Sequence, residues 1–508
     1  MTYAEPLVLS TPLPPATLAA APCSLLTRAD AAELDRLTIV FGGSDGLTLM
    51  QRAGAAVVAV IEQHYESTRC IVLCGNGNNG GDGFIVAELL RQAEWDVACV
   101  ACGNMPESGD AFAARQRYQG SVLSWDTALL AEAGLVIDAI FGVGLSRPLD
   151  SGLSALVTAV NKSAVPVVAI DMPSGIQADS GAVLGVAIRA TQTVTFTRKK
   201  PGLLLLPGRD HAGHVIVADI NVDMDALYNL PLRYAENTPA LWRDMLPQFT
   251  ATQHKYDHGH ALILGGGVMT GAARLAARAC QRTGAGLVSI AAPPYATLVY
   301  ASNLDSVLVQ PISTTEDWKK QIDDRRKTAF LLGPGAGVSE LLQQQVLAAL
   351  ETDKPTVLDA DALTCFAESP ELLFRVVRPH TVLTPHTGEF LRLFGPQQEF
   401  SDRLAVVSRM AQMLQCVILL KGSDTVIAAP DGRAIINTNA PPWLATAGSG
   451  DVLAGVITGF MAQGVAAFHA TCIGAWLHGA AAQNFQPGMI AEDLIATLPA
   501  TMAAIAAD

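Results

Sequence analysis

The sequence predicts two α/β domains in series, the first of them a doubly wound, Rossmann-like domain. In both halves short apolar runs alternate with helix-like segments, and residues 231–249 between the halves contain several prolines and little periodicity. Continuous apolar strands separated by helices indicate a parallel sheet that is covered on both faces. The length of 508 residues fits two or about three domains, and we place the two at residues 24–228 and 236–508.

The expected elements follow one another along both halves. Helices are expected at residues 47–64, 84–93 and 271–283 and directly after Asp451; strands are expected at residues 70–74, 97–101, 135–140, 165–170, 261–264, 287–291, 329–332, 356–358 and 417–421. The strands are short and uniformly apolar, and turn-forming residues flank them, which separates them from buried helices.

The composition excludes several classes of protein. The net charge is −14, so the basic footprint that nucleic-acid binding needs is missing, although a small phosphate ligand can still bind to backbone N–H groups at a helix start. Residues 1–22 lack the pattern of a signal peptide and are expected to form a loose arm. Cys99 and Cys102 form one C-x-x-C pair, which we interpret as part of a strand core, and the nine scattered cysteines favour a reducing, cytoplasmic setting.

Residues 452–491 contain no charged residue, yet Gln463, His469, His478 and several glycines interrupt the apolar pattern. A membrane span requires a cleaner apolar stretch, so no membrane association is expected. Buried helices or a subunit interface explain the stretch better, and we expect a homo-oligomer.

The first glycine-rich motif reads CGNGNNGGDG at residues 74–83, where it follows a strand and opens a helix. Its glycines let the backbone approach a ligand closely, and free N–H groups at the helix start suit a pyrophosphate. Asn78, Asn79 and Asp82 add polar side chains to the same loop. Such a loop can also be a structural turn, so the motif needs support from elsewhere in the chain.

Two aspartates supply that support. Asp138 ends one strand and precedes FGVGLSRP, and Asp171 ends another strand and precedes MPSG. A single Asp in this position is often only a helix cap. Because the carboxyl ends of parallel strands share one crevice, both aspartates and the Asn-rich loop should meet in one site.

The second glycine-rich motif reads ATAGSGDVLAG at residues 445–455 and leads directly into a helix. The N–H groups at that helix start could stabilise a phosphoryl group in transfer, and Asp451 could accept the proton of the attacking hydroxyl. The alternative is that Asp451 merely caps the helix.

In the first half, GNGNNGGDGF, DAIFGVG and AIDMPSG resemble, in order and spacing, the motifs of the NAD(P)H-hydrate epimerase family over residues 26–225. The resemblance implies a potassium ion held by Asn79, Asp138 and Ser174, and oxygen ligands of this kind suit a hard cation. It implies that the hydrated dinucleotide is bound by Asn78, Asn79, Gly80, Gly81, Asp82, Gly142, Val143, Gly144, Leu145, Ser146, Arg147, Pro148 and Asp171. A carboxylate near C6 of the nicotinamide ring would act as acid and base, with Asp138 as the first candidate and Asp171 as its rival.

The second half resembles the ribokinase-like fold and, within it, the ADP/ATP-dependent NAD(P)H-hydrate dehydratases. The matching segments are LGGG, TGAA, LGPGAG, LDADAL, LTPHTGE and LKGSDT, between residues 264 and 425. The resemblance implies that the hydrate contacts Ala272, Gly335, His386 and Asp451, and that the adenine nucleotide contacts Lys421, Gly422, Ser423, Asp424, Thr425 and Gly450. One segment departs from the family: where Asn-Pro-Gly is usual, this chain reads Asn439-Ala440-Pro441-Pro442-Trp443, which leaves the geometry on the nucleotide side open.

Together the resemblances imply the repair of hydrated NADH and NADPH (NADHX and NADPHX). The first domain would interconvert the R and S forms at C6, and the second would dehydrate the S form with ADP as phosphoryl donor, giving AMP and phosphate. ATP is the alternative donor, and magnesium would help to bind the nucleotide's phosphates. The rival interpretation is a ribokinase-like kinase of a small molecule fused to a non-catalytic dinucleotide-binding module.

Overall fold

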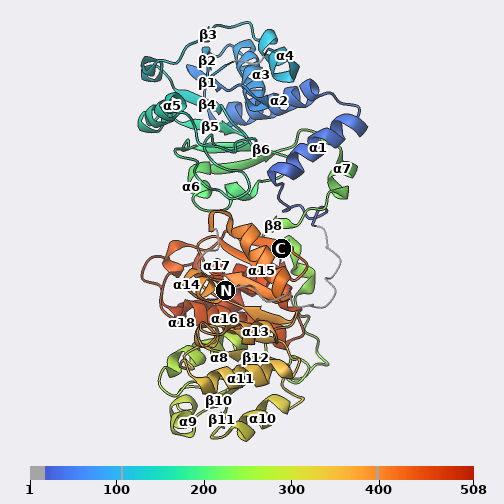
Figure 1. The fold of residues 1–508 in the computed structure, drawn as a ribbon, viewed down its shortest axis with the longest axis vertical. Coiled ribbons are helices and arrows are strands. Elements are labelled where there is room, and N and C mark those ends of the chain that lie inside the picture. Colours follow the sequence, from blue (N-terminus) through green and yellow to red (C-terminus); the bar gives the residue numbers. More distant parts are fainter. Residues whose placement is uncertain (1–17, 105–106, 396–399, 508) are drawn as a thin grey trace, which may run out of the picture. The chain divides into compact units, whose positions relative to one another are not determined.

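The computed structural model describes residues 18–104, 107–395 and 400–507. The chain forms two compact units, the first ending at Tyr234 and the second beginning at Ala235 (Figure 1). Of the loose arm expected at residues 1–22, residues 1–17 lie outside the described part of the chain.

The first unit is built on a seven-stranded sheet in the order β3-β2-β1-β4-β5-β6-β7. Its strands are β1 (Cys70–Cys74), β2 (Val97–Ala101), β3 (Val122–Leu123), β4 (Leu135–Ala139), β5 (Val167–Ile170), β6 (Gln192–Phe196) and β7 (His214–Ala218). Every neighbouring pair is parallel. The strand order reverses between β1 and β4, which confirms the doubly wound fold and makes this the point where such folds bind ligands.

Helices cover both faces of this sheet. They are α1 (Arg28–Phe41), α2 (Gly46–His64), α3 (Asn78–Gln92), α4 (Gly109–Arg117), α5 (Ser151–Lys162), α6 (Gly208–Ala212) and α7 (Met224–Asn229). Successive residues of a strand point to opposite faces. Val72 therefore packs with Phe84 of α3 on one face, while Ile71 packs with Leu156 of α5 on the other.

The second unit is built on a ten-stranded mixed sheet in the order β11-β10-β9-β12-β13-β14-β15-β16-β17-β8. Its strands are β8 (Tyr234–Glu236), β9 (His260–Leu264), β10 (Leu287–Ala292), β11 (Leu308–Pro311), β12 (Ala329–Leu332), β13 (Thr356–Leu358), β14 (Thr381–Leu383), β15 (Val417–Leu420), β16 (Thr425–Ala428) and β17 (Ala434–Asn437). β16 runs antiparallel to both β15 and β17. The interpretation of residues 231–249 as an irregular linker is wrong at β8, a three-residue strand too short to show any periodicity.

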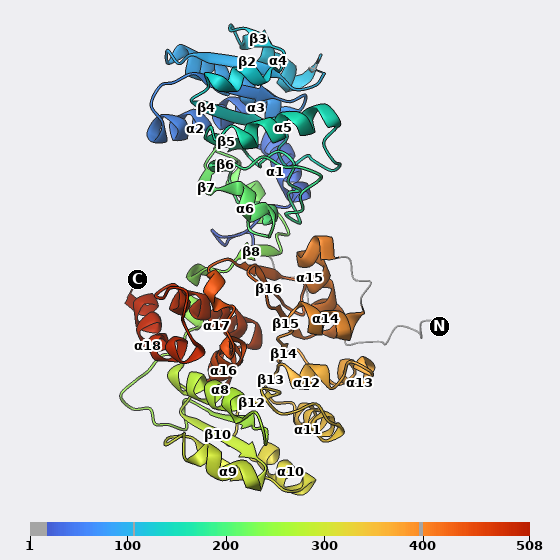
Figure 2. The ribbon, with the colours of Figure 1, turned by 90° about the vertical axis from the view of Figure 1, so that its left-hand side faces the viewer.

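Two layers of helices enclose the second sheet, with α8, α16, α17 and α18 on one side and α11 to α14 on the other (Figure 2). The helices are α8 (Thr270–Arg282), α9 (Pro294–Ala301), α10 (Thr315–Asp323), α11 (Glu340–Glu351), α12 (Asp361–Thr364), α13 (Pro370–Phe374), α14 (Thr387–Phe394), α15 (Arg403–Leu414), α16 (Ser449–Ala462), α17 (Ala467–Ala482) and α18 (Ala491–Ala507).

The uncharged stretch at residues 452–491 forms most of α16 and all of α17, and nearly all of the side chains that lie in these two helices are buried. Close packing explains its small residues: a Cβ on Gly455 would come within 2.2 Å of the Ala276 carbonyl oxygen in α8. Within the described ranges, no helix is both long enough and apolar enough to cross a membrane.

Candidate active sites

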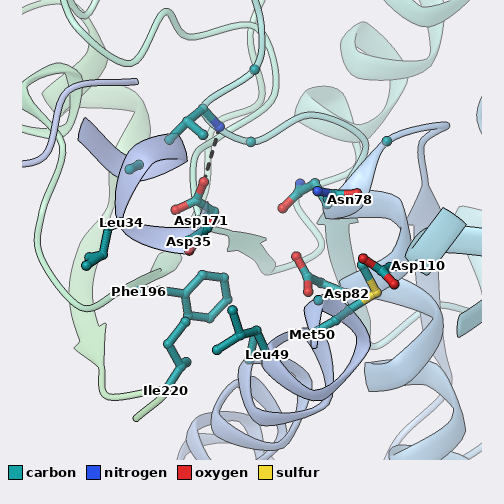
Figure 3. A pocket seen from close by; sticks show the side chains of 18 of the residues that line it. Leu34, Asp35, Leu49, Met50, Asn78, Asp82, Asp110, Asp171, Phe196 and Ile220 are labelled. Carbon is teal, nitrogen blue, oxygen red and sulfur yellow. Dashed lines mark hydrogen bonds between the residues drawn. The ribbon is translucent and has the colours of Figure 1, made fainter. Parts of the chain in front are cut away.

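The first unit carries a cavity of about 490 Å³ at the strand ends where the sheet order reverses. Its walls come from the loops after β1, β4 and β5, from α1 and α2, and from residues that follow β6 (Figure 3). The side chains that matter below are those of Asp35, Asn78, Asn79, Asp82, Asp110, Asp171 and Lys200, with Leu34, Leu49, Met50, Phe196 and Ile220 as an apolar floor.

The Asn-rich loop brings the N-terminus of α3 to the cavity. Its N-cap, Gly77, has no side chain to satisfy the first N–H groups of the helix, so these remain available to an anion. A Cβ on Gly80 would lie 2.0 Å from the Gly75 carbonyl oxygen, so the turn is too tight for any other residue. The side-chain amide nitrogen of Asn79 is buried without a hydrogen-bond partner. A ligand group at this loop would satisfy it.

Asp138 is completely buried behind the cavity and is not among the lining residues. Its Oδ1 accepts a hydrogen bond from Ser174 Oγ at 2.6 Å and one from the Ile140 N–H at 3.2 Å, and its Oδ2 accepts the Ser174 N–H at 2.7 Å. Burial raises the pKa of Asp138 to about 6 although these hydrogen bonds oppose the shift. Asp138 therefore ties the loop after β4 to the loop after β5.

Asp171 lines the cavity and forms an ion pair with Lys200. Lys200 Nζ lies 2.6 Å from Asp171 Oδ1 and 2.8 Å from Thr195 Oγ1. The Thr195 hydroxyl donates to Oδ1 at 3.2 Å, and the Val143 N–H donates to Oδ2 at 3.1 Å. Only 3% of the Lys200 side chain is exposed, so Asp171 faces the cavity and the lysine lies beneath it.

The structure brings together only part of the expected dinucleotide site. Asn78, Asn79, Asp82, Gly142, Val143, Gly144 and Asp171 line the cavity, whereas Gly80, Gly81, Leu145, Ser146, Arg147 and Pro148 are not among the lining residues. Gly80 and Gly81 are buried inside the turn, and Leu145 is a core residue at 5% exposure.

Sequence reasoning missed Asp35 and Lys200. Asp35 lies on α1, far from any glycine-rich motif, and only the tertiary fold brings it to the cavity. The Lys-Pro-Gly step after β6 was the one available signal for Lys200. Desolvation by the cavity walls, partly offset by Lys200, raises the pKa of Asp35 to about 6.

The second unit carries its candidate site at the N-terminus of α16. Gly448 adopts the left-handed conformation with φ of 85° and leaves the first N–H groups of the helix without a side-chain cap. Asp451 lies in the first turn, and burial, together with the charge of Asp359, raises its pKa to about 6 against the opposing effect of Lys421. A Cβ on Gly450 would lie 3.7 Å from Lys421 Nζ, so the ammonium group lies beside the helix start.

Lys421 is held there by Asp359, which is 1% exposed. The ammonium lies 2.7 Å from Asp359 Oδ1, and Thr384 Oγ1 donates to the same oxygen at 2.8 Å. Burial alone would lower the pKa of Lys421, but the nearby carboxylates, Asp359 above all, raise it on balance. The lysine therefore stays charged at the helix start.

His386 caps α14 with its own ring. Nδ1 accepts the N–H groups of Gly388 and Glu389 at 2.9 and 3.3 Å, and the Glu389 carboxylate accepts the His386 N–H at 2.9 Å. With Nδ1 used as an acceptor, the neutral ring carries its proton on Nε2. About half of the His386 side chain is exposed, and its Nε2 lies 3.5 Å from Glu389 Oε1, so a ligand would compete with that carboxylate for the Nε2 proton.

Two further expectations concern neighbouring loops. Gly335, with φ of 63°, lies against α8, and its Cβ would be 3.2 Å from that of Ala272, so these two expected hydrate contacts are adjacent. Asp424, expected at the nucleotide, is fully buried and its Oδ1 lies 2.7 Å from Arg403. Its side chain stabilises the turn at residues 421–425 from behind.

The unusual Asn439–Trp443 segment is fixed to α17. Asn439 Nδ2 donates to the Trp476 carbonyl at 2.8 Å, and Trp443 Nε1 donates to the Ala482 carbonyl at 2.8 Å. Ser449 Oγ then donates to the Leu444 carbonyl at 2.9 Å, which connects the segment to the start of α16.

Cys99 and Cys102 are buried free thiols in and just after β2, as expected for a strand core. In the part of the chain that the structure describes, no group of three or more His, Cys, Asp or Glu residues could hold a metal ion.

Comparison with known proteins matches both halves to families. Residues 46–202 match the family described as YjeF-related protein N-terminus, and residues 261–501 match the family described as NAD(P)H-hydrate dehydratase. The bifunctional NAD(P)H-hydrate repair enzyme of Moorella thermoacetica is 38% identical over 94% of this chain and 96% of its own length. That of Escherichia coli is 33% identical over 89% of each chain.

Among solved structures, the ADP/ATP-dependent NAD(P)H-hydrate dehydratase from Bacillus subtilis, co-crystallised with ATP and Mg²⁺, is 30% identical. The match covers 53% of this chain and 98% of that one, with a TM-score of 0.46. The expected fold class, a Rossmann-like unit followed by a ribokinase-like unit, is confirmed.

Proposed function

This chain belongs to the family of bifunctional NAD(P)H-hydrate repair enzymes, with an epimerase domain followed by a dehydratase domain, and on that premise we propose which residues carry each reaction. We assign the epimerase to residues 24–228 and the dehydratase to residues 236–508. The first interconverts the R and S forms of NADHX and NADPHX at C6, and the second returns the S form to the reduced dinucleotide.

In the epimerase domain, the free N–H groups at the start of α3 bind the pyrophosphate of the hydrated dinucleotide. The nicotinamide ring then lies over the apolar floor formed by Leu49, Met50 and Phe196, with the cavity's carboxyl groups around it.

Asn79, Asp138 and Ser174 are the proposed potassium ligands. The side-chain oxygens of the three residues fit a hard monovalent cation, whereas the unsatisfied Nδ2 of Asn79 is a hydrogen-bond donor and suits the anionic substrate. When bound, the ion supplies positive charge that favours the dinucleotide's phosphates. Asp138 is proposed to hold this ion and the two loops and not to transfer protons, because its oxygens are already hydrogen-bonded and it does not line the cavity.

In the dehydratase domain, Asp451 accepts the proton of the C6 hydroxyl as that oxygen attacks the terminal phosphorus of ADP, and AMP leaves. Loss of phosphate from C6 and of a proton from C5 then restores the ring double bond. Lys421 and the N–H groups of α16 stabilise the phosphoryl group in transfer, and Asp359 with Thr384 positions Lys421. Lys421–Thr425 and Gly450 bind the nucleotide, with the buried Asp424 side chain supporting this turn and magnesium on the phosphates, and Ala272, Gly335 and His386 bind the hydrate.

The observation that carries this assignment is one carboxylate and one ammonium, Asp451 and Lys421, at an uncapped helix start. The test is incubation with mixed epimers and ADP, following recovery of the reduced ring, AMP and inorganic phosphate. Complete recovery with release of phosphate supports it. A stable phosphate ester would favour a ribokinase-like kinase, and ATP used in preference to ADP would correct the donor.

We also propose that the chain acts as a homo-oligomer in the cytoplasm. On the second unit, Val268, Met269, Tyr295 and Leu298 are at least two-thirds exposed, which is unusual for large apolar side chains and supports a subunit contact there. Light scattering on the purified chain tests this, and a monomeric mass would contradict it.

A further inference from the structure

The epimerase cavity contains more carboxyl groups than binding requires. Asp35, Asp82, Asp110 and Asp171 line it, and Lys200 is the one Lys or Arg among its lining residues. The cavity therefore carries a net negative charge, which is an unusual environment for a substrate with a pyrophosphate. The acidic wall must face a neutral or cationic part of the dinucleotide.

Two of these four aspartates are poorly placed for proton transfer. Both oxygens of Asp171 are engaged, Oδ1 by Lys200 and Thr195 and Oδ2 by the Val143 N–H. Asp110 lies against the first residue of α2, since its Oδ2 would be 2.0 Å from a Cβ on Gly46. Asp35 and Asp110 are both exposed, so this contact, and not exposure, separates them.

Asp35 and Asp82 are the two remaining lining aspartates. Within the described residues, neither carboxyl group forms a hydrogen bond or an ion pair. They come from different elements, α1 and α3, and extend from different walls of the cavity (Figure 3). Desolvation raises the pKa of Asp35 to about 6, and desolvation together with Asp171 and Asp35 raises the pKa of Asp82 well above its ordinary value.

The position of Asp35 is set by the fold and not by the glycine-rich motifs. Thr27 and Asp30 cap α1 reciprocally, and Leu34 packs in the core with Leu26 and Ile220. With Leu34 buried, the next residue is held at the cavity wall. Residues 46–202, which match the epimerase-type family, do not include α1, so the family match does not by itself identify Asp35.

We propose that Asp35 and Asp82 are the proton-transferring pair of the epimerase, acting on opposite faces of the nicotinamide ring at C6. The proposal rests on the function proposed above, namely that this cavity holds the hydrated ring. Inversion at C6 needs a proton donor on one face and a proton acceptor on the other. Carboxyl groups on two walls of one cavity provide both.

The chemistry balances without a further reactant. One carboxylic acid donates its proton to the C6 hydroxyl, the C6–O bond breaks, water leaves, and the N1 lone pair forms an N1=C6 bond. A second water then adds to C6 on the opposite face and gives a proton to the other carboxylate. The reverse reaction uses the same two groups with exchanged roles.

The charge of the cavity favours this route over ring opening. The ring is cationic after the C6–O bond breaks, and the surrounding carboxylates stabilise that charge. Opening of the C6–N1 bond would instead transfer a proton to the leaving nitrogen and form no cationic ring for the carboxylates to stabilise. The acidic wall therefore also predicts which bond breaks.

Asp35→Asn tests the pair, since it preserves size and removes only the ionisable group. The assay follows interconversion of a purified epimer by chromatography, without nucleotide, so that the dehydratase domain is silent. We expect the rate to fall by roughly 10²-fold or more, with partial recovery in Asp35→Glu. Glu33→Gln, on the same helix but in an exposed pair with Arg36, is the matched control and should match the unmodified chain.

If the Asp35→Asn variant interconverts the epimers at a rate within about twofold of the Glu33→Gln control, the assignment of Asp35 and Asp82 as the proton-transferring pair is wrong. Unchanged ADP-dependent dehydration of the S epimer verifies that the variant chain is folded. Failure of the unmodified chain to interconvert the epimers would instead overturn the proposed function of this cavity, so the two failures are distinguishable.

The bond that breaks is tested in ¹⁸O-labelled water, with an enzyme-free sample to measure spontaneous exchange. Each inversion should place one labelled oxygen on C6 of the product. Inversion faster than label uptake would mean that the C6–O bond stays intact, and would overturn the cationic route.

Discussion

Both active sites contain a lysine–aspartate ion pair, but the more deeply buried member of the pair differs between them. Each contains a lysine–aspartate pair at the strand ends, with N–O distances of 2.6 Å for Lys200–Asp171 and 2.7 Å for Lys421–Asp359. In the epimerase the lysine side chain is 3% exposed and the aspartate faces the cavity. In the dehydratase the aspartate side chain is 2% exposed, and the lysine, at 23%, lies beside Gly450.

This difference decides the charge that each site presents. A hidden lysine leaves the epimerase cavity acidic, which suits a ring that becomes positive. A hidden aspartate leaves the dehydratase site with an ammonium beside a helix N-terminus, which suits a phosphoryl group. Both domains have an α/β architecture, so the fold class does not determine the charge of the site. That charge depends on which member of the ion pair is more deeply buried.

The largest expected effect tests whether the sites work independently. Asp451→Asn should reduce dehydration by roughly 10²–10⁴-fold, because the amide cannot accept the hydroxyl proton. Epimerisation should be unchanged. Glu492→Gln, an exposed acid in the first turn of α18, is the control. Near-normal dehydration by Asp451→Asn would show that another group is the base.

Lys200→Met removes the hidden member of the epimerase pair and leaves Asp171 buried without its counter-ion. Breaking a buried pair in this way costs about 3–5 kcal/mol, so the first unit should unfold at a clearly lower temperature. Lys162→Met, at the exposed end of α5, should have little effect. Hydrogen exchange of peptides from β4 to β6 shows where the first unit loses stability. Equal protection from exchange in the two variants would contradict the structural role of Lys200.

The sequence was sufficient for the elements whose signal is local. The bounds of β1 and β13 agree with the expected residues 70–74 and 356–358, because continuous apolar runs between turn residues have few other interpretations. The start of α3 was placed six residues too late, at residue 84 instead of Asn78. Asn and Gly are poor helix formers, and only tertiary packing of the turn makes them the first turn of the helix.

The strands β3, β6, β7, β8, β11, β14, β16 and β17 escaped prediction, and length is not the whole reason, because β13 has three residues and was expected while β6 and β7 have five. In β6, QTVTF, polar residues interrupt the apolar run that marks the expected strands. The site was predictable where motif residues follow a strand, as for Asn79 and Asp171, or open a helix, as for Asp451. Asp35 carries no such signal, because its place depends on how α1 packs. Asp359 follows β13 within a quoted motif, but its role depends on a lysine 62 residues away, which no local pattern shows.

The pH dependence of dehydration should follow Asp451. Because burial raises its pKa to about 6, the carboxylate is ionised and active above that pH and is lost as the pH falls through it. The rate should therefore fall about tenfold per pH unit below this point. The measurement is the dehydration rate at saturating ADP across the acidic range, and a flat profile down to the ordinary pKa of Asp would contradict the assignment.

The smallest expected effect concerns the segment in which this chain departs from its family. Trp443 donates a hydrogen bond to the Ala482 carbonyl at 2.8 Å, and Ser449 connects the same segment to the start of α16. Trp443→Phe retains an aromatic ring but loses that donor. A hydrogen bond contributes about 0.5–1.5 kcal/mol, so the KM for ADP should rise roughly 2- to 10-fold, with little change in kcat.

Because the base Asp451 and its partner Lys421 are untouched, the loss should appear in nucleotide binding and not in the chemical step. Trp125→Phe, at a partly buried position against the core of the epimerase unit, is the matched control and should leave the KM for ADP unchanged. An unaltered KM in Trp443→Phe would mean that the start of α16 keeps its geometry without this anchor. Nucleotide binding in the dehydratase site would then depend on the Lys421–Asp359 pair and not on the Trp443 segment. The epimerase site would be comparable, since its charge is set by the Lys200–Asp171 pair.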